Sequence, residues 1–324
     1  MKPKQILSLL LAGCLLGLST ACAHRAAVEE SPSQPEMEQE IQPDPVEEEP
    51  VSPPQPEPAP EEPLAADEPQ PEEEPVSQPE EPAALASVSV DAAALSSLDG
   101  TKLGWGPGGP VDGDNRPSGA TAYQEKYGQY DADFIRENDR TIYLTFDEGY
   151  ENGYTAQILD VLKEKQVPAV FFVTMPYAES NPDLIQRMID EGHTVGNHSV
   201  NHPSFPDTPL DQCKDEVAGL HDYIQEEYGY TMQLFRFPMG EFCEQDLKLL
   251  QEMGYRSVFW SFAYRDWLVD DQPDPAQALE TICSKAHPGA IYLLHAVSQT
   301  NTQILGQVID RLRAEGYEFA AYPA

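Results

Sequence analysis

Two adjacent carboxylates end a short apolar run near the middle of the chain. The run from Thr141 to Phe146 is rich in β-branched and aromatic residues, and Asp147, Glu148 and Gly149 follow it directly. Its length and composition predict a buried parallel strand rather than a helix. Carboxylates at the end of a buried strand are costly unless they hold a cation or exchange protons. The alternative is an ordinary surface loop after a strand.

A second group with chemical potential is a pair of histidines. His198 and His202 are four residues apart, and on a helical turn both imidazoles would face the same way and could bind one metal ion. This spacing also arises by accident on helix surfaces. Combined with a carboxylate from a neighbouring strand end, it predicts a catalytic metal site with an open position. Zinc is the default metal, and the sequence does not exclude cobalt, manganese or iron.

Hydrolysis at such a metal also needs an acid for the leaving group. His295 follows the apolar run that starts at Ile291, and a histidine suits proton donation near neutral pH. The alternative is a capped or core histidine after a strand. Arg236 can orient a carboxylate through two parallel hydrogen bonds, or form a surface salt bridge. Trp267 could form a wall for a sugar ring, although large aromatic residues more often belong to the core.

The elements that must position these residues alternate from residue 140 onwards. Strands are expected near residues 141–146, 168–173, 193–196, 234–237, 256–260, 290–294 and 317–321. Helices are expected near residues 154–166, 181–191, 208–227, 243–252, 275–284 and 301–314. This alternation predicts a parallel sheet with right-handed crossovers, either a barrel or an open sheet. The polar clusters all follow strands, so they should meet at the carboxyl edge of the sheet.

The first part of the chain has a different composition. Residues 1–22 have a short basic start and an apolar run of signal-peptide length, which predicts export. The residues before Cys22 are similar to the lipobox of bacterial lipoproteins, so we expect a lipid anchor there and a protein facing the cell wall; Cys14 is the alternative. Residues 23–95 are rich in Pro and Glu and should form a disordered linker. We expect an arm over residues 96–139 that packs on the catalytic domain, residues 140–324.

The charge of the chain limits the classes of partner that we expect, and its cysteines limit the possible disulfides. The 324 residues include 56 acidic and 19 basic side chains, which argues against nucleic acid as a partner. We expect the protein to be a monomer. Cys213, Cys243 and Cys283 allow at most one disulfide, and their spacing does not reveal a pair.

Five motifs together resemble one enzyme family. They are Thr145–Gly149, His198–His202, Arg236–Pro238, Asp266–Trp267 and Leu293–His295. Their order and spacing are similar to those of the polysaccharide deacetylase family, also called the NodB-homology group or carbohydrate esterase family 4. Longer stretches around three of them look like the branch of delta-lactam-biosynthetic de-N-acetylases, which act on muramic acid residues of peptidoglycan.

The resemblance implies a fold and a set of roles. The fold would be a distorted (β/α)7 barrel. Asp147 would be the general base and Arg236 would hold it, while His295 would be the general acid. His198 and His202 would bind the metal. The substrate would be contacted by the backbone amide of Met239, which would bind the oxyanion, by Leu293 in the acetyl pocket, and by Tyr150, Asp266 and Trp267.

Three departures from the family pattern affect these roles. The family usually has a metal-binding Asp where this chain has Glu148, and we expect Glu148 to be the third ligand if its longer side chain reaches the metal. The third motif usually has two prolines, and Phe237 replaces the first. Many members place an Asp at the position of Ala263 to tune the acid histidine, so the pKa of His295 should be less controlled than usual.

The sequence thus predicts a metal-dependent de-N-acetylase acting on muramic acid residues of peptidoglycan glycan strands. Two alternatives remain. One is deacetylation of chitin-like or xylan-like polymers. The other is a wall-binding lipoprotein in which Glu148 prevents metal capture.

Overall fold

The run that leads into the paired carboxylates forms, together with them, a strand, β3 (Thr141–Glu148), in the interior of the main sheet. The computed structural model describes residues 90, 92–137 and 139–323. The predicted signal segment and nearly all of the predicted linker therefore lie outside the described residues.

β3 belongs to a nine-stranded sheet in which every recorded pairing is parallel. The strand order is β2-β8-β6-β5-β4-β3-β10-β9, and β11 pairs with the beginning of β3. Within the described residues β2 and β9, the two ends of this order, do not pair with each other. The curled sheet therefore stays open as a half-barrel. This is the distorted barrel that the sequence predicted. The strands are β2 (Ala132–Asp133), β4 (Ala169–Val173), β5 (Thr194–Asn197), β6 (Leu234–Phe235), β8 (Arg256–Val258), β9 (Phe262–Ala263), β10 (Ala290–His295) and β11 (Glu318–Phe319).

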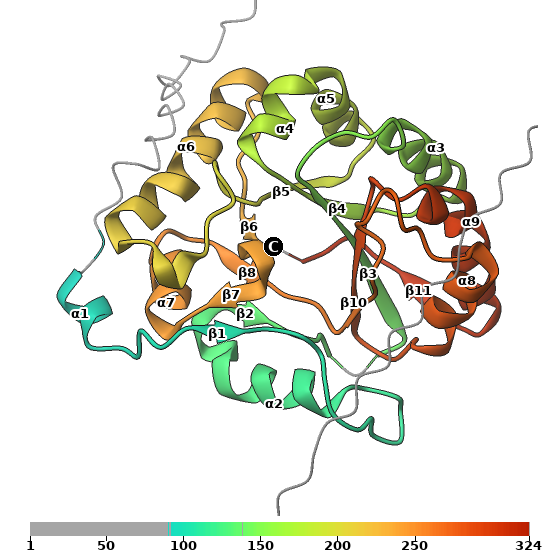
Figure 1. Ribbon diagram of the computed structural model, residues 1–324, viewed down its shortest axis with the longest axis horizontal. Helices are drawn as coiled ribbons and strands as arrows, with labels where there is room; N and C mark the ends of the chain where they lie inside the picture. The colour runs from blue at the N-terminus through green and yellow to red at the C-terminus, as the bar shows by residue number, and fades with distance from the viewer. Residues whose placement is uncertain (1–89, 91, 138, 324) are drawn as a thin grey trace, which may run out of the picture. The chain divides into compact units, whose positions relative to one another are not determined.

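Helices lie around the outside of the curled sheet (Figure 1). They are α3 (Thr155–Lys165), α4 (Met175–Ser180), α5 (Pro182–Asp190), α6 (Leu210–Tyr228), α7 (Glu244–Glu252), α8 (Pro275–Ser284) and α9 (Gln299–Ala314). The predicted helices are all present, and α4 is an addition. Gly192, Gly254 and Gly316 follow α5, α7 and α9 with φ of 79°, 79° and 86°. This left-handed conformation ends each helix, and glycine adopts it without steric strain.

The two faces of the strands are both buried, and each packs in a different hydrophobic cluster. Phe146 of β3 belongs to the large core that also includes buried residues of the helices. Tyr143, on the opposite face of β3, packs in a smaller inner cluster with Val170 and Phe172 of β4 and Ile291 of β10. Because side chains alternate along a strand, Asp147 lies on the same inner face as Tyr143. Glu148 lies on the same outer face as Phe146.

The arm before β3 contains more regular structure than expected. It includes α1 (Ala92–Ser96), β1 (Leu103–Gly104), α2 (Ser118–Tyr127) and β2, which is an edge strand of the main sheet. β1 pairs antiparallel with β7 (Glu241–Phe242). The buried side chain of Leu95 in α1 already belongs to the large core, at the end of the range predicted as linker.

Two further findings concern the cysteines and the helices of the described residues. Cys213, Cys243 and Cys283 are free and buried. Among the described residues, no helix combines the length and the hydropathy that a membrane span requires.

Candidate active site

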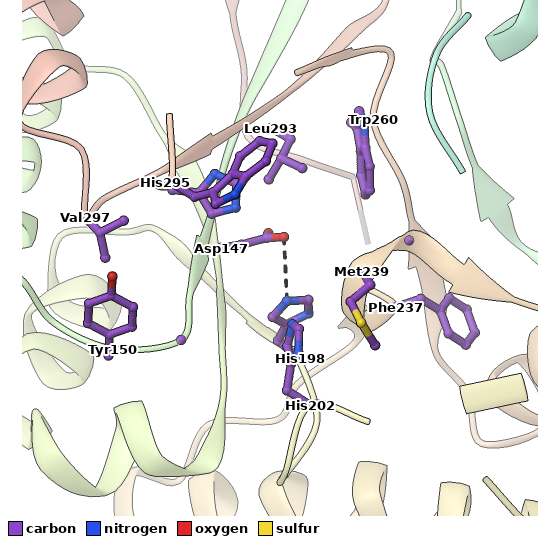
Figure 2. Close-up of a pocket in the computed structure, with 13 residues that line it drawn as sticks. Asp147, Tyr150, His198, His202, Phe237, Met239, Trp260, Leu293, His295 and Val297 are labelled. Carbon is purple, nitrogen blue, oxygen red and sulfur yellow. Dashed lines mark ion pairs between the residues drawn. The ribbon is translucent and has the colours of Figure 1, made fainter. Parts of the chain in front are cut away.

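A pocket of about 460 Å³ opens where the carboxyl ends of β3, β5 and β10 meet. Figure 2 shows Asp147 near its centre, with His295 on one side and His198 on the other. The lining residues are Asp147, Gly149, Tyr150, His198, His202, Phe237, Met239, Gly240, Trp260, Trp267, Leu293, His295 and Val297. The convergence predicted from strand ends is therefore present.

Asp147 lies between an arginine and a histidine. The Arg236 Nη1 atom donates a 2.8 Å hydrogen bond to Asp147 Oδ1, and His198 Nε2 lies 3.6 Å from Asp147 Oδ2 (dashed in Figure 2). Burial opposes ionisation of Asp147, but the charges of Arg236, His198 and His295 outweigh it and lower its pKa below the ordinary value. Asp147 is therefore an ionised proton acceptor at neutral pH.

Arg236 is completely buried, and each of its guanidinium nitrogens has an acceptor. Its Nε donates to the carbonyl oxygen of Val258 at 2.9 Å, and Nη2 donates to that of Phe259 at 3.0 Å. Nη1 also donates to Thr145 Oγ1 at 2.7 Å. A buried charge is tolerated only when it is paired and hydrogen-bonded, so this network fixes both Arg236 and the carboxylate of Asp147.

His198 and His202 face one another, but they do not lie on a helical turn. Their ring centroids are 4.7 Å apart, within an irregular loop after β5 in which Ser199 and His202 have φ of 71° and 55°. The backbone amide of His202 donates to Ser199 Oγ at 2.9 Å, and that of Asn201 donates to Glu216 Oε2 at 2.7 Å. The predicted helical turn is wrong, because these side-chain acceptors replace the helical hydrogen bonds.

The chemistry of the two histidines fits a divalent metal. His198 Nδ1 lies 2.8 Å from the carbonyl oxygen of Arg236, which can only accept, so Nδ1 carries the proton and Nε2 offers a lone pair. Burial lowers the pKa of His198 to about 4 and also lowers that of His202. Both are therefore neutral at neutral pH, as ligation requires. Within the described residues, no group of three or more His, Cys, Asp or Glu side chains is arranged to hold a metal.

Glu148 is absent from the pocket, which corrects its assignment as the third metal ligand. As the last residue of β3 it points to the helix side of the sheet, opposite to Asp147. It is completely buried, and neither carboxyl oxygen has a hydrogen-bond partner. Burial, followed by the charges of Glu151 and Asp147, raises its pKa well above the ordinary value. The site thus offers two imidazole ligands without this carboxylate.

His295 has a carboxylate partner, contrary to the expectation based on Ala263. Its Nδ1 lies 2.7 Å from Asp266 Oδ1, and its backbone amide donates to Asp266 Oδ2 at 2.9 Å. Burial opposes protonation of His295, but Asp266 and then Asp147 outweigh it and raise its pKa above the ordinary value. Asp266 is fully buried and does not line the pocket. It therefore positions His295, and its assignment as a substrate-binding residue is corrected.

The rim of the pocket is largely apolar. Tyr150, Met239 and Trp267 are about half exposed, at 53%, 54% and 47%, while Leu293 lies deeper and is buried. The Trp267 ring centroid lies 5.6 Å from that of His295. These four side chains line the pocket as predicted, and the exposed aromatic faces suit the apolar face of a sugar ring.

Sequence reasoning gave no role to several residues that build this site. Thr145, which accepts from Arg236, precedes Asp147 by two residues, so strand alternation could have placed it on the same face. Asn301 donates to Asp266 Oδ2 at 2.6 Å from the first turn of α9. Trp260 and Val297 line the pocket. Trp260 lies within a stretch that resembles the family, but no pattern in the sequence marked Asn301 or Val297.

Known proteins are similar to this chain in sequence and in fold. Residues 135–258 match the profile of a family described as polysaccharide deacetylase. The peptidoglycan-N-acetylmuramic acid deacetylase PdaA of Bacillus subtilis (strain 168) is 44% identical over 193 residues, which cover 59% of this chain and 73% of that protein. The peptidoglycan-N-acetylglucosamine deacetylase of Bacillus cereus is 29% identical over 191 residues, covering 58% of this chain and 68% of that protein.

A solved structure agrees with the sequence comparison. The structure of Bacillus subtilis PdaA, described as a family 4 carbohydrate esterase, has a TM-score of 0.66 and 39% sequence identity with this chain. The similarity covers 69% of this chain and 96% of the other.

Proposed function

The chain belongs to the polysaccharide deacetylase family, carbohydrate esterase family 4, and we propose that it removes N-acetyl groups from muramic acid residues of peptidoglycan. The observation that carries the proposal is the pocket itself. An ionised Asp147 and a protonatable His295 face the same cavity, each fixed by its own buried partner. The 44% identity to a protein named for muramic acid deacetylation supports the choice of sugar.

Asp147 acts as the general base. Its pKa is lowered, its Oδ1 is occupied by Arg236, and its Oδ2 remains to take a proton from the attacking water. The water oxygen then bonds to the acetyl carbon, and the carbonyl oxygen gains negative charge. The backbone amide of Met239, at the pocket wall, is assigned to stabilise this charge, and Leu293 receives the acetyl methyl group.

His295 acts as the general acid. Asp266 holds its Nδ1 and favours the imidazolium, so Nε2 can donate a proton to the amide nitrogen as the carbon–nitrogen bond breaks. The products are acetate and the free amine of the sugar. The two carboxylates thus have different roles. Asp147 accepts the proton of the attacking water, and Asp266 stabilises the proton that His295 donates to the leaving nitrogen.

The family's chemistry implies a divalent metal, for which we propose zinc, with cobalt or manganese as alternatives. The neutral imidazoles of His198 and His202 would hold it beside Asp147. Such an ion, when bound, supplies Lewis-acid activation of the water and the acetyl carbonyl.

The choice of sugar is tested by mapping the lost acetyl groups. Purified glycan strands, chitin oligomers and acetylated xylan are incubated with the protein, and the products are digested and analysed by mass spectrometry. We expect deacetylated muramic acid from the glycan strands and little product from the other two polymers. Loss of acetyl groups only from glucosamine or from chitin would refute the muramic acid assignment.

One observation favours a second candidate, a wall-binding protein with a degenerate site. Glu148 lies outside the pocket, so the site lacks the carboxylate ligand that the family pattern supplies. Metal content after dialysis against zinc distinguishes the two. The enzyme should retain close to one ion per chain, whereas a binding protein should retain none and still sediment with peptidoglycan.

We further propose that the protein is exported and anchored to the membrane by a lipid on Cys22, and that it acts as a monomer. The apolar run and the small residues before Cys22 support the anchor. A Cys22→Ser variant should move from the membrane fraction to the medium, with Cys14→Ser as the matched control. Retention of Cys22→Ser in the membrane would contradict the anchor.

A further inference from the structure

The arm before β3 reaches the wall of the pocket at Trp105. We propose that Trp105 is a positioning residue for the deacetylation reaction, holding the Met239–Gly240 turn and Trp260 in place. The inference rests on the proposed function. It concerns a part of the chain that precedes the segment matched by the family profile, residues 135–258.

The backbone of the arm completes a strand pair with the segment that carries Met239. Leu103 pairs with Phe242 and Gly104 with Glu241, and the Trp105 amide then donates to the carbonyl oxygen of Gly240 at 2.9 Å. Among the described residues, β1 and β7 form a two-stranded sheet of their own. β7, which directly follows the Met239–Gly240 turn, therefore receives its strand partner from the arm rather than from the main sheet.

The Trp105 side chain contacts the second wall of the pocket. Its Nε1 donates to the carbonyl oxygen of Trp260 at 2.9 Å in a buried hydrogen bond. The ring is 7% exposed and packs against Phe134 and Tyr123, with centroids 4.7 and 4.8 Å away. Trp105 thus links Gly240, through its backbone amide, to Trp260, through its indole, and both of these residues line the pocket.

The turn held in this way has an unfavourable backbone. Met239 has φ of 58° and Gly240 has φ of 68°. A left-handed conformation is uncommon for a side chain such as Met, and it persists where the surroundings fix it. A Cβ atom on Gly240 would lie 2.7 Å from the Trp260 ring and 3.2 Å from the Trp105 carbonyl oxygen. Gly240 is therefore required for this close approach, and the two tryptophans enclose the turn.

The consequence for catalysis concerns the transition state more than substrate binding. The Met239 amide is assigned to the developing oxyanion, so a loosened turn loses an interaction that is made mainly in the transition state. Such a loss lowers kcat and kcat/KM together and leaves KM nearly unchanged.

The test compares Trp105→Ala and Trp105→Phe with Leu312→Ala in the full chain. Leu312 is a buried residue of α9 that does not line the pocket, so its variant controls for general destabilisation. Acetate release and hydrogen exchange of the peptide spanning residues 236–243 are measured below the melting temperature of every variant. We expect kcat to fall about tenfold or more in Trp105→Ala, with KM within about twofold, and faster exchange in that peptide. Trp105→Phe should have a kcat and an exchange rate of this peptide between those of Trp105→Ala and the wild type.

The outcomes separate this inference from the proposed function. If Trp105→Ala retains wild-type kcat and wild-type exchange, or if Leu312→Ala changes both equally, the positioning role is refuted. If the wild-type protein releases no acetate, the proposed function fails. The exchange of residues 236–243 then still shows whether Trp105 holds the turn.

Discussion

At the residue scale, two buried pairs set opposite proton affinities in one pocket. Arg236 holds Asp147 and lowers its pKa, whereas Asp266 holds His295 and raises its pKa. In both cases the neighbouring charges together outweigh burial, and the largest contribution comes from Arg236 for Asp147 and from Asp266 for His295. This division gives the pocket a base that is free of its proton and an acid that retains one at the same pH.

The Asp266–His295 pair predicts a shift in pH dependence. The rate requires protonated His295, so activity should fall as pH rises through its pKa, which lies above the ordinary 6.5. Asp266→Asn removes the charge that raises this pKa. We expect the alkaline limb of kcat/KM to move to lower pH and kcat at neutral pH to fall by roughly tenfold to a hundredfold.

The matched control for this prediction is Asp271→Asn. Asp271 is an exposed aspartate, five residues beyond Asp266, and it forms an ion pair with Arg265. The Asp271→Asn variant should leave the pH–rate profile unchanged. An alkaline limb that stays in place in Asp266→Asn would show that His295 is not the titrating acid.

Glu148 predicts a different pH effect, on stability. Its carboxyl group is buried without a hydrogen-bond partner, and its pKa is raised well above the ordinary 4.5. The folded state therefore holds the proton to higher pH than the unfolded state does. Stability should fall as pH rises above 4.5 through the folded pKa. Glu148→Gln cannot ionise, so we expect it to gain roughly 1–3 kcal/mol over the wild type at neutral pH and little at acid pH.

Thermal unfolding across this pH range measures the difference. The exposed Glu164→Gln serves as the control and should track the wild type throughout. The same variants report on the metal, because Glu148→Gln should bind zinc as tightly as the wild type if Glu148 is not a ligand. A marked loss of zinc affinity in Glu148→Gln would restore it as a ligand.

At the element scale, a loop rather than a helix brings the two histidines together. Four-residue spacing alone could not distinguish the two, because both place the imidazoles close to each other. The distinguishing information lies in side-chain hydrogen bonds within the loop and to α6, such as those of Ser199 and Glu216. These depend on the tertiary arrangement and leave no periodic signal.

Glu216 of α6 predicts how strongly the loop is held. It accepts from the backbone and the side chain of Asn201, both at 2.7 Å, within the segment between the two histidines. Groups that orient metal ligands typically contribute about tenfold or more to affinity. We expect Glu216→Ala to bind cobalt or zinc about tenfold more weakly with little change in melting temperature.

Glu226→Ala is the control, since Glu226 is an exposed residue of the same helix. Titration with cobalt, followed by its absorption spectrum, measures the affinity. Equal cobalt affinity in the two variants would mean that the loop is fixed by other contacts.

The regular elements were largely predictable, and the reasons are physical. Strands and helices after residue 140 bury continuous or periodic apolar faces, which a sequence displays directly. Two-residue strands such as β1, β2, β7 and β9 have no periodicity, so the partners of the arm remained hidden. The same limit applies to Glu148, because the strand was expected to stop at Phe146 while pairing continues through both carboxylates.

At the scale of the whole molecule, residues from distant parts of the chain share one pocket because the sheet is parallel. β3 and β10 pair in register, with His295 opposite Asp147. β5 delivers its loop with His198 and His202 to the same edge, and Arg236 follows β6. The carboxyl ends of parallel strands lie at one edge of the sheet. The positions of the strand ends in the sequence therefore predicted which residues share the candidate site.

The central claim is that Asp147 accepts the proton of the attacking water in a pocket that it shares with His295 and the two histidines. Acetate release from purified glycan strands by wild type and Asp147→Asn, both zinc-loaded and shown to be folded, tests it most directly. Asn keeps the size of the side chain and loses the proton acceptor, so the account predicts a rate at least about a hundredfold lower for the variant. Equal acetate release by the two proteins would contradict it.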